Sequence, residues 1–406
     1  MQPRSMPSVG LRRGSRLKVC DLTQFYSPVS GGVRRYIEQK SAYVRRHRPD
    51  CQHVIIVPGA ATEQSGDEHV RMYTIASPLI SRTSRYRALT RLHLIEEALE
   101  KERPDVIESG DPYQVAWKAV ASGRGLDIPV VGFYHSHFPE SYIRTMAKFF
   151  GPVSVSITDE FFRRYVTALY NHFERTFVPS PVLAKTLRSW GVERLMTVDL
   201  GVDAETFVPD PDDSVLTREG LGIPTGARLL LYVGRLAPEK NVRTLLDAFR
   251  LLHSREAGRY HLLCVGDGTQ RQAVMDLREA TGLVTWTPYC SDPRDLAAIY
   301  RAADLFVHPG VQETFGLVAL ESQASGTCVV GIRGSYMDRI IFNDQQHWAL
   351  ENSPGALADA ITSIFSLDLR EAGLEASHHA RSRYSWKTVF GRLFSAYESV
   401  IAGYSA

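Results

Sequence analysis

Cysteine is scarce in this chain of 406 residues, which has only five, and none of them lies close to another. No two cysteines form a CxxC pair, so the sequence offers neither a redox motif nor a cysteine-based metal motif. An odd number of widely spaced cysteines is typical of reduced thiols in a cytosolic protein. We therefore expect a cytoplasmic protein. The five cysteines are Cys20, Cys51, Cys264, Cys290 and Cys328.

Long apolar runs are also lacking. No stretch approaches the roughly 18 apolar residues that a membrane-spanning helix needs. The N-terminus is basic, but no apolar segment follows it, which argues against a secretory signal peptide. We expect residues 1–15 to form a disordered basic tail, and the alternative is an arm that contacts anionic lipid.

Charge of one sign is not in excess, because the formal net charge is only +2. This balance gives no argument for nucleic acid as a partner. The hydrophobic fraction of 44% and the charged fraction of 23% are ordinary for a globular protein. A chain of this length predicts about two domains.

Strand-like apolar runs alternate with helix-like segments, which predicts parallel sheets with crossover helices. One helix is expected over 87–102, another from Asn241, a residue type that favours the N-cap, and a last one around 386–401. Strands are expected at 17–22, 53–57, 70–75, 105–108, 129–134, 176–179, 196–200, 228–233, 261–265, 284–287, 305–308 and 327–332.

Residues 208–214 are rich in proline and aspartate, and we interpret them as a linker. The expected organisation is an α/β chain with two Rossmann-like domains and a ligand crevice at the carboxyl ends of the strands. Its parts are the tail at 1–15, an N-terminal domain at 16–207, a C-terminal domain at 208–384, and a helix at 385–406 that crosses back to the N-terminal domain.

Two carboxylates with seven residues between them give the sharpest signal. Glu313 follows a predicted strand, and Glu321 lies in a helix predicted to begin near Gly316. At about 1.5 Å per helical residue the two carboxylates are on the order of 10 Å apart, too far to share a metal ion. They suit the two ends of a long polar ligand, with a diphosphate facing the helix start between them. The alternative is an ordinary helix start followed by a solvated glutamate.

A second signal follows the strand at 228–233. Gly234 ends this strand, and Arg235 and Lys240 flank the turn into the next helix. Arginine suits bidentate phosphate contacts, and lysine adds a point charge. The alternative is a solvated loop with two charges.

Two loops of the first half carry weaker signals. Gly31 and Gly32 allow close approach of a ligand to the backbone at a helix start, although a glycine pair is more often only a turn. His135 and His137 come directly after the strand expected at 129–134. No third metal ligand is evident, so we favour a polar contact to a sugar over a zinc site.

Taken together and in this order, the motifs resemble glycosyltransferase family 4, over nearly the whole chain from Gly31 to the terminal helix. The resemblance implies the GT-B fold, in which two Rossmann-like domains face each other across a cleft. It further implies a GDP- or UDP-sugar as donor, retention of the anomeric configuration, and neither an essential metal nor a cofactor.

The resemblance also implies roles for individual residues. Glu313 would contact the donor sugar and Glu321 the ribose, while Arg235 and Lys240 would stabilise the departing diphosphate. His135 would reach the sugar from the opposite domain, and with Glu313, Arg235 and Lys240 it completes the expected catalytic set. The expected donor-binding residues are Glu321 and a set that offers backbone contacts: Gly31, Gly32, Gly234, Phe315, Gly316 and Leu317.

The segment 134–151 interleaves aromatic residues with Arg144 and Lys148, and it is similar to the branch that glycosylates lipids, including mannosyl- and sulfoquinovosyl-type enzymes. This similarity implies a lipid acceptor such as diacylglycerol or a glycolipid, or a glycan. It also implies a peripheral place at the inner face of an anionic membrane. The alternative is an amphipathic helix packed on its own domain.

Two sequence features need comment against the family pattern, and there are two alternative functions. Gly334 and Ser335 stand where the family often has a glycine pair near the donor, and Asp210 and Asp212 form a DxD sequence that we discount as a metal site because it lies in the linker. The rivals are a GT-B nucleotide-sugar epimerase and a non-catalytic nucleotide-sugar-binding protein on the same fold.

Overall fold

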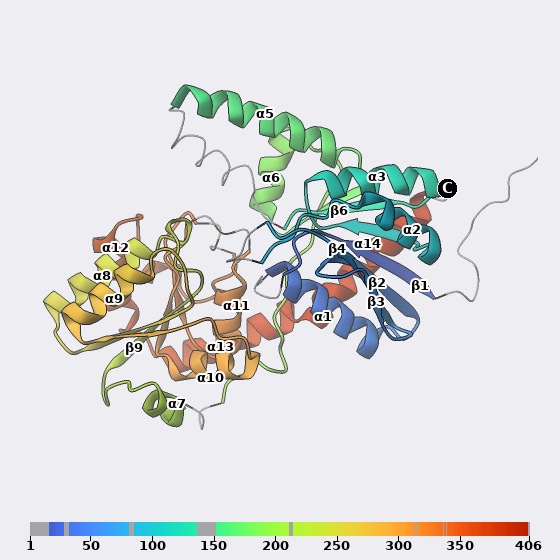
Figure 1. Ribbon diagram of the computed structural model, residues 1–406. Helices are drawn as coiled ribbons and strands as arrows, with labels where there is room; N and C mark the ends of the chain where they lie inside the picture. The colour runs from blue at the N-terminus through green and yellow to red at the C-terminus, as the bar shows by residue number, and fades with distance from the viewer. Residues whose placement is uncertain are drawn as a thin grey trace, which may run out of the picture. The chain divides into compact units, whose positions relative to one another are not determined.

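The computed structural model describes residues 16–27, 32–80, 85–135, 152–210, 214–311, 313, 315–335, 337 and 339–404, and it describes the side chains of 152–158 no further. The chain forms two compact units (Figure 1). The first comprises Met1–Asp199 and Val389–Ala406, and the second comprises Leu200–Thr388. The predicted basic tail, Gly31, His137 and almost all of the 134–151 segment lie outside the described residues.

The first unit is built on an eight-stranded sheet in the order β3-β4-β2-β1-β5-β6-β7-β8. Neighbouring strands run parallel except for the β3–β4 pair. The strands are β1 (Leu17–Leu22), β2 (Cys51–Gly59), β3 (Glu63–Gly66), β4 (Val70–Ala76), β5 (Val106–Ser109), β6 (Val130–Phe133), β7 (Arg175–Val178) and β8 (Leu195–Thr197).

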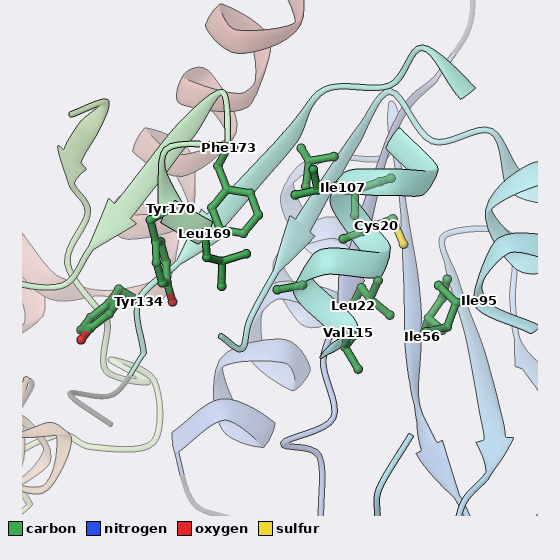
Figure 2. Close-up of a cluster of buried hydrophobic side chains, with 14 of the residues drawn as sticks. Cys20, Leu22, Ile56, Ile95, Ile107, Val115, Tyr134, Leu169, Tyr170 and Phe173 are labelled. Atoms are coloured by element: carbon green, nitrogen blue, oxygen red, sulfur yellow. The ribbon is translucent and has the colours of Figure 1, made fainter. Parts of the chain in front are cut away.

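Helices cover both faces of this sheet. Those on one side include α2 (Leu92–Glu102) and α3 (Gln114–Leu126), which contact each other, and those on the other include α1 (Gly32–His47) and α14 (Trp386–Tyr404) (Figure 1). The unit is completed by α5 (Pro152–Tyr170) and α6 (Pro181–Ser189). Figure 2 shows the apolar core between the sheet and α2, α3 and the end of α5, with Cys20, Ile107 and Phe173 among its side chains. A Cβ on Gly132 would lie 2.5 Å from the Phe173 ring, so this close approach requires glycine.

The second unit holds a five-stranded parallel sheet in the order β11-β10-β9-β12-β13. On one side α8 packs against α9 and α12, and on the other α10 contacts α7 and α11, which in turn contacts α13 (Figure 1). The strands are β9 (Arg228–Val233), β10 (Tyr260–Val265), β11 (Val284–Thr287), β12 (Leu305–Val307) and β13 (Val329–Val330). The helices are α7 (Ser214–Gly220), η1 (Pro238–Lys240), α8 (Val242–Arg255), α9 (Arg271–Thr281), α10 (Pro293–Ala302), α11 (Leu317–Ala324), η2 (Gln345–His347), α12 (Pro354–Ile364) and α13 (Leu369–Tyr384).

The expected α/β architecture with two parallel-sheet domains is confirmed, and β1, β9 and β11 have the predicted bounds. One helix start is wrong: α2 begins at Leu92 and not at Arg87, because Arg87 forms a β-bridge with Leu79. The short strand β3 was not predicted. All four of its residues are exposed, so it carries no apolar pattern.

The first unit closes at Asp199, before the proline- and aspartate-rich segment at 208–214. Residues just after Asp199 are held by the second unit's own contacts, since Val202 N–H donates to Tyr384 O at 2.8 Å and Phe207 packs against Tyr300. Helix α14 starts at Trp386, and from Val389 onward it belongs to the first unit.

Candidate functional site

The strand order of the second unit has a switch point between β9 and β12. From β9 the chain proceeds to β10 and β11 on one side, whereas β12 and β13 lie on the other. Ligands of open parallel sheets bind at such a point, beyond the carboxyl ends of the strands. The loop after β9 carries Gly234, Arg235 and Lys240, and the loop after β12 carries Glu313.

These two loops meet through an ion pair. Lys240 Nζ lies 2.5 Å from Glu313 Oε1, and the two side chains are only 28% and 15% exposed. Burial is the largest single influence on the pKa of Glu313 and would raise it. The charge of Lys240 and its hydrogen bond, together with smaller contributions from His308 and Arg235, outweigh burial and lower the pKa below its ordinary value. Glu313 is therefore ionised at neutral pH. Two residues 73 positions apart in the sequence thus form one polar centre.

His308 is a third member of this centre that the sequence did not single out. Its Nε2 lies 3.9 Å from Glu313 Oε1, and the residue is 4% exposed. Burial lowers the pKa of His308 more strongly than Glu313 raises it, so the imidazole is neutral at pH 7. A histidine directly after a buried strand was the available signal, in the same way as for His135.

Asn241 fixes the two loops to each other. Asn241 is the N-cap residue of α8, as predicted, but its backbone has φ +57°, in the left-handed region where asparagine is enriched, and its side chain makes no cap hydrogen bond. The side-chain amide instead donates to Pro309 O at 2.8 Å and to Asn352 Oδ1 at 2.7 Å. The asparagine next to Lys240 therefore ties the loop after β9 to the loop that carries Glu313.

Arg235 has a different environment from Lys240. Its side chain is 66% exposed, and its guanidinium lies 3.3 Å from Glu239 on the same turn. A Cβ on the preceding Gly234 would lie 3.0 Å from the Tyr232 hydroxyl, so a side chain there would press on that ring. Arg235 nevertheless lies near enough for its charge to help lower the pKa of Glu313.

The predicted helix start after Glu313 is confirmed, because α11 begins at Leu317 with Gly316 as its N-cap. Gly316 has φ +89°, a left-handed conformation that favours glycine, and a Cβ there would displace the end of the Met337 side chain. The neighbouring Phe315 is buried, and Arg339 lies over its ring. Ser335 accepts the Met337 N–H at 3.3 Å, which braces the loop that departs from the family's glycine pair.

Glu321 lies within α11 and is 2% exposed. Its carboxylate accepts the Tyr300 hydroxyl at 3.2 Å. The alternative of an ordinary solvated glutamate at this position is therefore wrong. A carboxylate kept in the interior needs hydrogen-bond donors, and the Tyr300 hydroxyl is one of them.

The first unit holds the remaining predicted residues. Gly32 is the first residue of α1 and is exposed, with no atom within 4 Å of an added Cβ. His135 follows β6 and stacks on Phe133 at 4.2 Å between ring centroids. The Tyr36 ring makes a T-shaped contact with His135, with ring centroids 4.8 Å apart. Burial lowers the pKa of His135 to about 3, so the imidazole is neutral and can donate or accept a hydrogen bond.

In the part of the chain that the structure describes, no group of three or more histidine, cysteine, aspartate or glutamate side chains lies close enough to hold a metal ion. No helix among the same residues is both long and apolar enough to cross a membrane.

Two family models match the chain. The model described as "Glycosyltransferase Family 4" matches residues 30–206, and "Glycosyl transferases group 1" matches residues 215–382. The chain is 30% identical over 358 residues to the GDP-mannose-dependent alpha-(1-6)-phosphatidylinositol dimannoside mannosyltransferase of Mycobacterium tuberculosis, covering 86% of this chain and 88% of that protein. It is 27% identical to a sulfoquinovosyl transferase of Arabidopsis thaliana, over 70% of this chain and 54% of that protein.

Among solved structures, sucrose-phosphate synthase from Thermosynechococcus elongatus matches with a TM-score of 0.74 at 19% identity. The match covers 96% of this chain and 100% of that chain. At this identity the structural similarity shows the fold alone, and it agrees with the GT-B fold expected from the sequence.

Proposed function

Because this chain belongs to glycosyltransferase family 4 and has its GT-B fold, we propose that it transfers mannose from GDP-mannose to a lipid-anchored acceptor, with retention of configuration and without a metal ion. The observation that carries this proposal is the polar centre at the β9–β12 switch point. There Lys240 and Glu313, from two loops, lie 2.5 Å apart.

The departing group of such a reaction is GDP, whose diphosphate gains negative charge as the bond to the sugar breaks. Fixed cations and helix N-termini stabilise such charge most when they are already in place. Lys240 is held by Glu313, and the neighbouring Asn241 ties its loop to Pro309. The backbone N–H groups at the start of α11 lie a few residues after Glu313. Arg235 is exposed and free to approach a phosphate by rotating its long side chain.

Glu313 is proposed to accept hydrogen bonds from the sugar hydroxyls. It is ionised and partly buried, so each bond would be charge-assisted. Glu321 is proposed to accept hydrogen bonds from the ribose hydroxyls, in addition to the one that it accepts from the Tyr300 hydroxyl. The choice of GDP-mannose over a UDP-sugar is supported by the identity to a mannosyltransferase over most of both chains.

The acceptor is proposed to be a glycolipid with a sugar or polyol headgroup. This is supported by the name of the same relative, which acts on phosphatidylinositol dimannoside, and by the aromatic and basic character of the sequence at 134–151. A soluble glycan is the competing acceptor.

The test is an incubation of the purified chain with radiolabelled GDP-mannose, UDP-glucose or UDP-galactose, each with vesicles that contain phosphatidylinositol mannosides. Label from GDP-mannose should enter the lipid phase, and the anomeric configuration of the new linkage, read by NMR, should match that of the donor. Lys240→Met should abolish most transfer, whereas Arg255→Gln, which removes an exposed arginine paired with Asp359, should not. Transfer only from a UDP-sugar would refute the donor, an inverted product would refute retention, and a changed free sugar without transfer would indicate an epimerase.

A further inference from the structure

A buried ion cluster lies beneath His135 in the first unit and has no part in the chemistry proposed above. Lys40 of α1 is fully buried, and its ammonium donates to Asp21 at 2.7 Å and to Glu108 at 3.0 Å. Asp21 and Glu108 lie opposite each other on the adjacent parallel strands β1 and β5. These are the two central strands, between which the strand order of the sheet reverses. One cation therefore bridges two carboxylates at the carboxyl end of the sheet.

Every other side chain in the cluster donates to, or pairs with, one of the carboxylates. His53 lies 2.7 Å from Asp21, and the hydroxyls of Tyr36 and Tyr397 donate to Glu108. Burying this much charge costs several kcal/mol per ion, and an apolar cluster would stabilise the fold at least as well. A cluster of this kind is therefore better explained by the geometry that it imposes than by stability.

Tyr36 is the member that connects the cluster to the candidate site. Its hydroxyl is fixed to Glu108 Oε1 at 3.0 Å. Its ring makes a T-shaped contact with the His135 imidazole, with centroids 4.8 Å apart, and a tilted contact with the Phe133 ring, with centroids 5.1 Å apart. Phe133 in turn stacks on His135 with an angle of only 12° between the rings. His135 is thus packed against one nearly parallel ring and one steeply inclined ring.

From these contacts we infer that Tyr36 is a positioning residue, which holds the His135 imidazole in the orientation needed to contact the reacting sugar. The inference rests on the proposed function, because it takes His135 as a substrate contact. The hydroxyl of Tyr36 anchors the ring to the buried Glu108, and the ring limits rotation of His135. The packing of the Phe133 and Tyr36 rings against the imidazole carries the orientation.

The test is a double-mutant cycle on turnover. Tyr36→Leu should lower kcat by about 10- to 100-fold, the loss expected when a reacting group is misplaced by about 1 Å. Tyr36→Phe keeps the ring and should retain kcat within about threefold, although it should melt at a lower temperature because Glu108 loses a donor. In a His135→Ala background, Tyr36→Leu should change kcat by no more than about twofold, because the residue it positions is gone.

A second readout does not depend on activity. The imidazole signals of His135, assigned with His135→Ala in protein labelled at histidine, should move in Tyr36→Leu and stay close to wild type in Tyr36→Phe. If Tyr36→Leu does not fold, Tyr36→Met replaces it in both measurements, since methionine is apolar, unbranched and a good helix former.

The outcomes separate the two proposals. Equal losses from Tyr36→Leu with and without His135, equal losses from Tyr36→Phe and Tyr36→Leu, or unmoved imidazole signals would each overturn the positioning role alone. Full activity in His135→Ala would instead overturn His135 as a substrate contact, and with it this part of the proposed function.

Discussion

Replacing Glu321 with glutamine tests whether this buried carboxylate binds the ribose of the donor. The substitution keeps the shape of the side chain and removes its charge. Glu321 is 2% exposed and is partnered by the Tyr300 hydroxyl, so alanine at this position would open a cavity and confuse folding with binding. Glutamine avoids the cavity and can still accept a hydrogen bond from Tyr300.

Hydrogen bonds to a charged group contribute about 1.5–3 kcal/mol each, and neutral ones about 1 kcal/mol. If two ribose hydroxyls donate to Glu321, Glu321→Gln should weaken GDP binding by about 1.5–3 kcal/mol, or roughly 10- to 150-fold in Kd. Titration calorimetry with GDP measures this directly, and a melting curve without nucleotide reports the fold.

The matched control is Tyr300→Phe, which removes the hydroxyl that donates to Glu321 and leaves the carboxylate in place. It should lower the melting temperature but change Kd for GDP by less than about threefold. A second comparison uses 2′,3′-dideoxy-GDP, which lacks the ribose hydroxyls and should bind the wild type weakly. Glu321→Gln should reduce the affinity for this analogue little further. Equal losses of affinity for GDP and dideoxy-GDP in Glu321→Gln, or normal GDP affinity with normal melting, would refute the ribose contact.

Three further predictions concern other parts of the molecule. Lys240→Ala should lower kcat by a larger factor than it raises Kd for GDP, because the charge that Lys240 stabilises is greatest in the transition state. Activity should also survive EDTA, because fixed cations stabilise the leaving diphosphate in the proposed reaction; activity lost in EDTA and restored by Mn²⁺ would refute this. The protein should co-sediment with anionic vesicles at low salt and less so as salt rises, while equal recovery in the supernatant with neutral and anionic vesicles would argue for a soluble acceptor. Burial by itself would raise the pKa of Glu102, but bonds from Tyr73, Lys18 and Arg71 lower it from 4.5 to about 2, so its stabilising contribution is complete above pH 4.5 and is lost as pH falls toward 2. Denaturant unfolding at pH 5 and pH 3 should therefore show a smaller pH effect in Glu102→Gln than in wild type.

The strands were predictable because most lie between two layers of helices, and such strands appear in the sequence as continuous apolar runs. Strand β3 escaped prediction because Glu63–Gly66 has no buried side at all. The start of α2 was misplaced because the apolar spacing continues upstream of Leu92, where pairing of Arg87 with Leu79 competes with the helix. Local pattern could not show that competition, since it depends on a partner outside the helix.

For the site, the sequence indicated which loops carry the polar residues but not how those residues pair. The bond between Lys240 and Glu313 joins positions 73 apart, and that between Tyr36 and Glu108 joins positions 72 apart. Such long separations leave no repeat in the sequence that would reveal the pairing. Only the order of the strands in the sheets brings the partners together. Asn241 shows the same limit, because the sequence placed it correctly at the start of α8 but could not show that its amide donates to Pro309.

The pairing of Lys240 with Glu313 bears on how a donor could enter the site. A largely buried lysine and a largely buried glutamate would each be costly to keep without a partner, and at 2.5 Å each satisfies the other. The proposed nucleotide-sugar donor would bring both a diphosphate anion and a set of hydroxyl donors. The anion would take the place of Glu313 beside Lys240, and the hydroxyls would take the place of Lys240 beside Glu313. Such a paired exchange would leave neither charge without a partner, and both groups would already be oriented when charge develops on the leaving diphosphate.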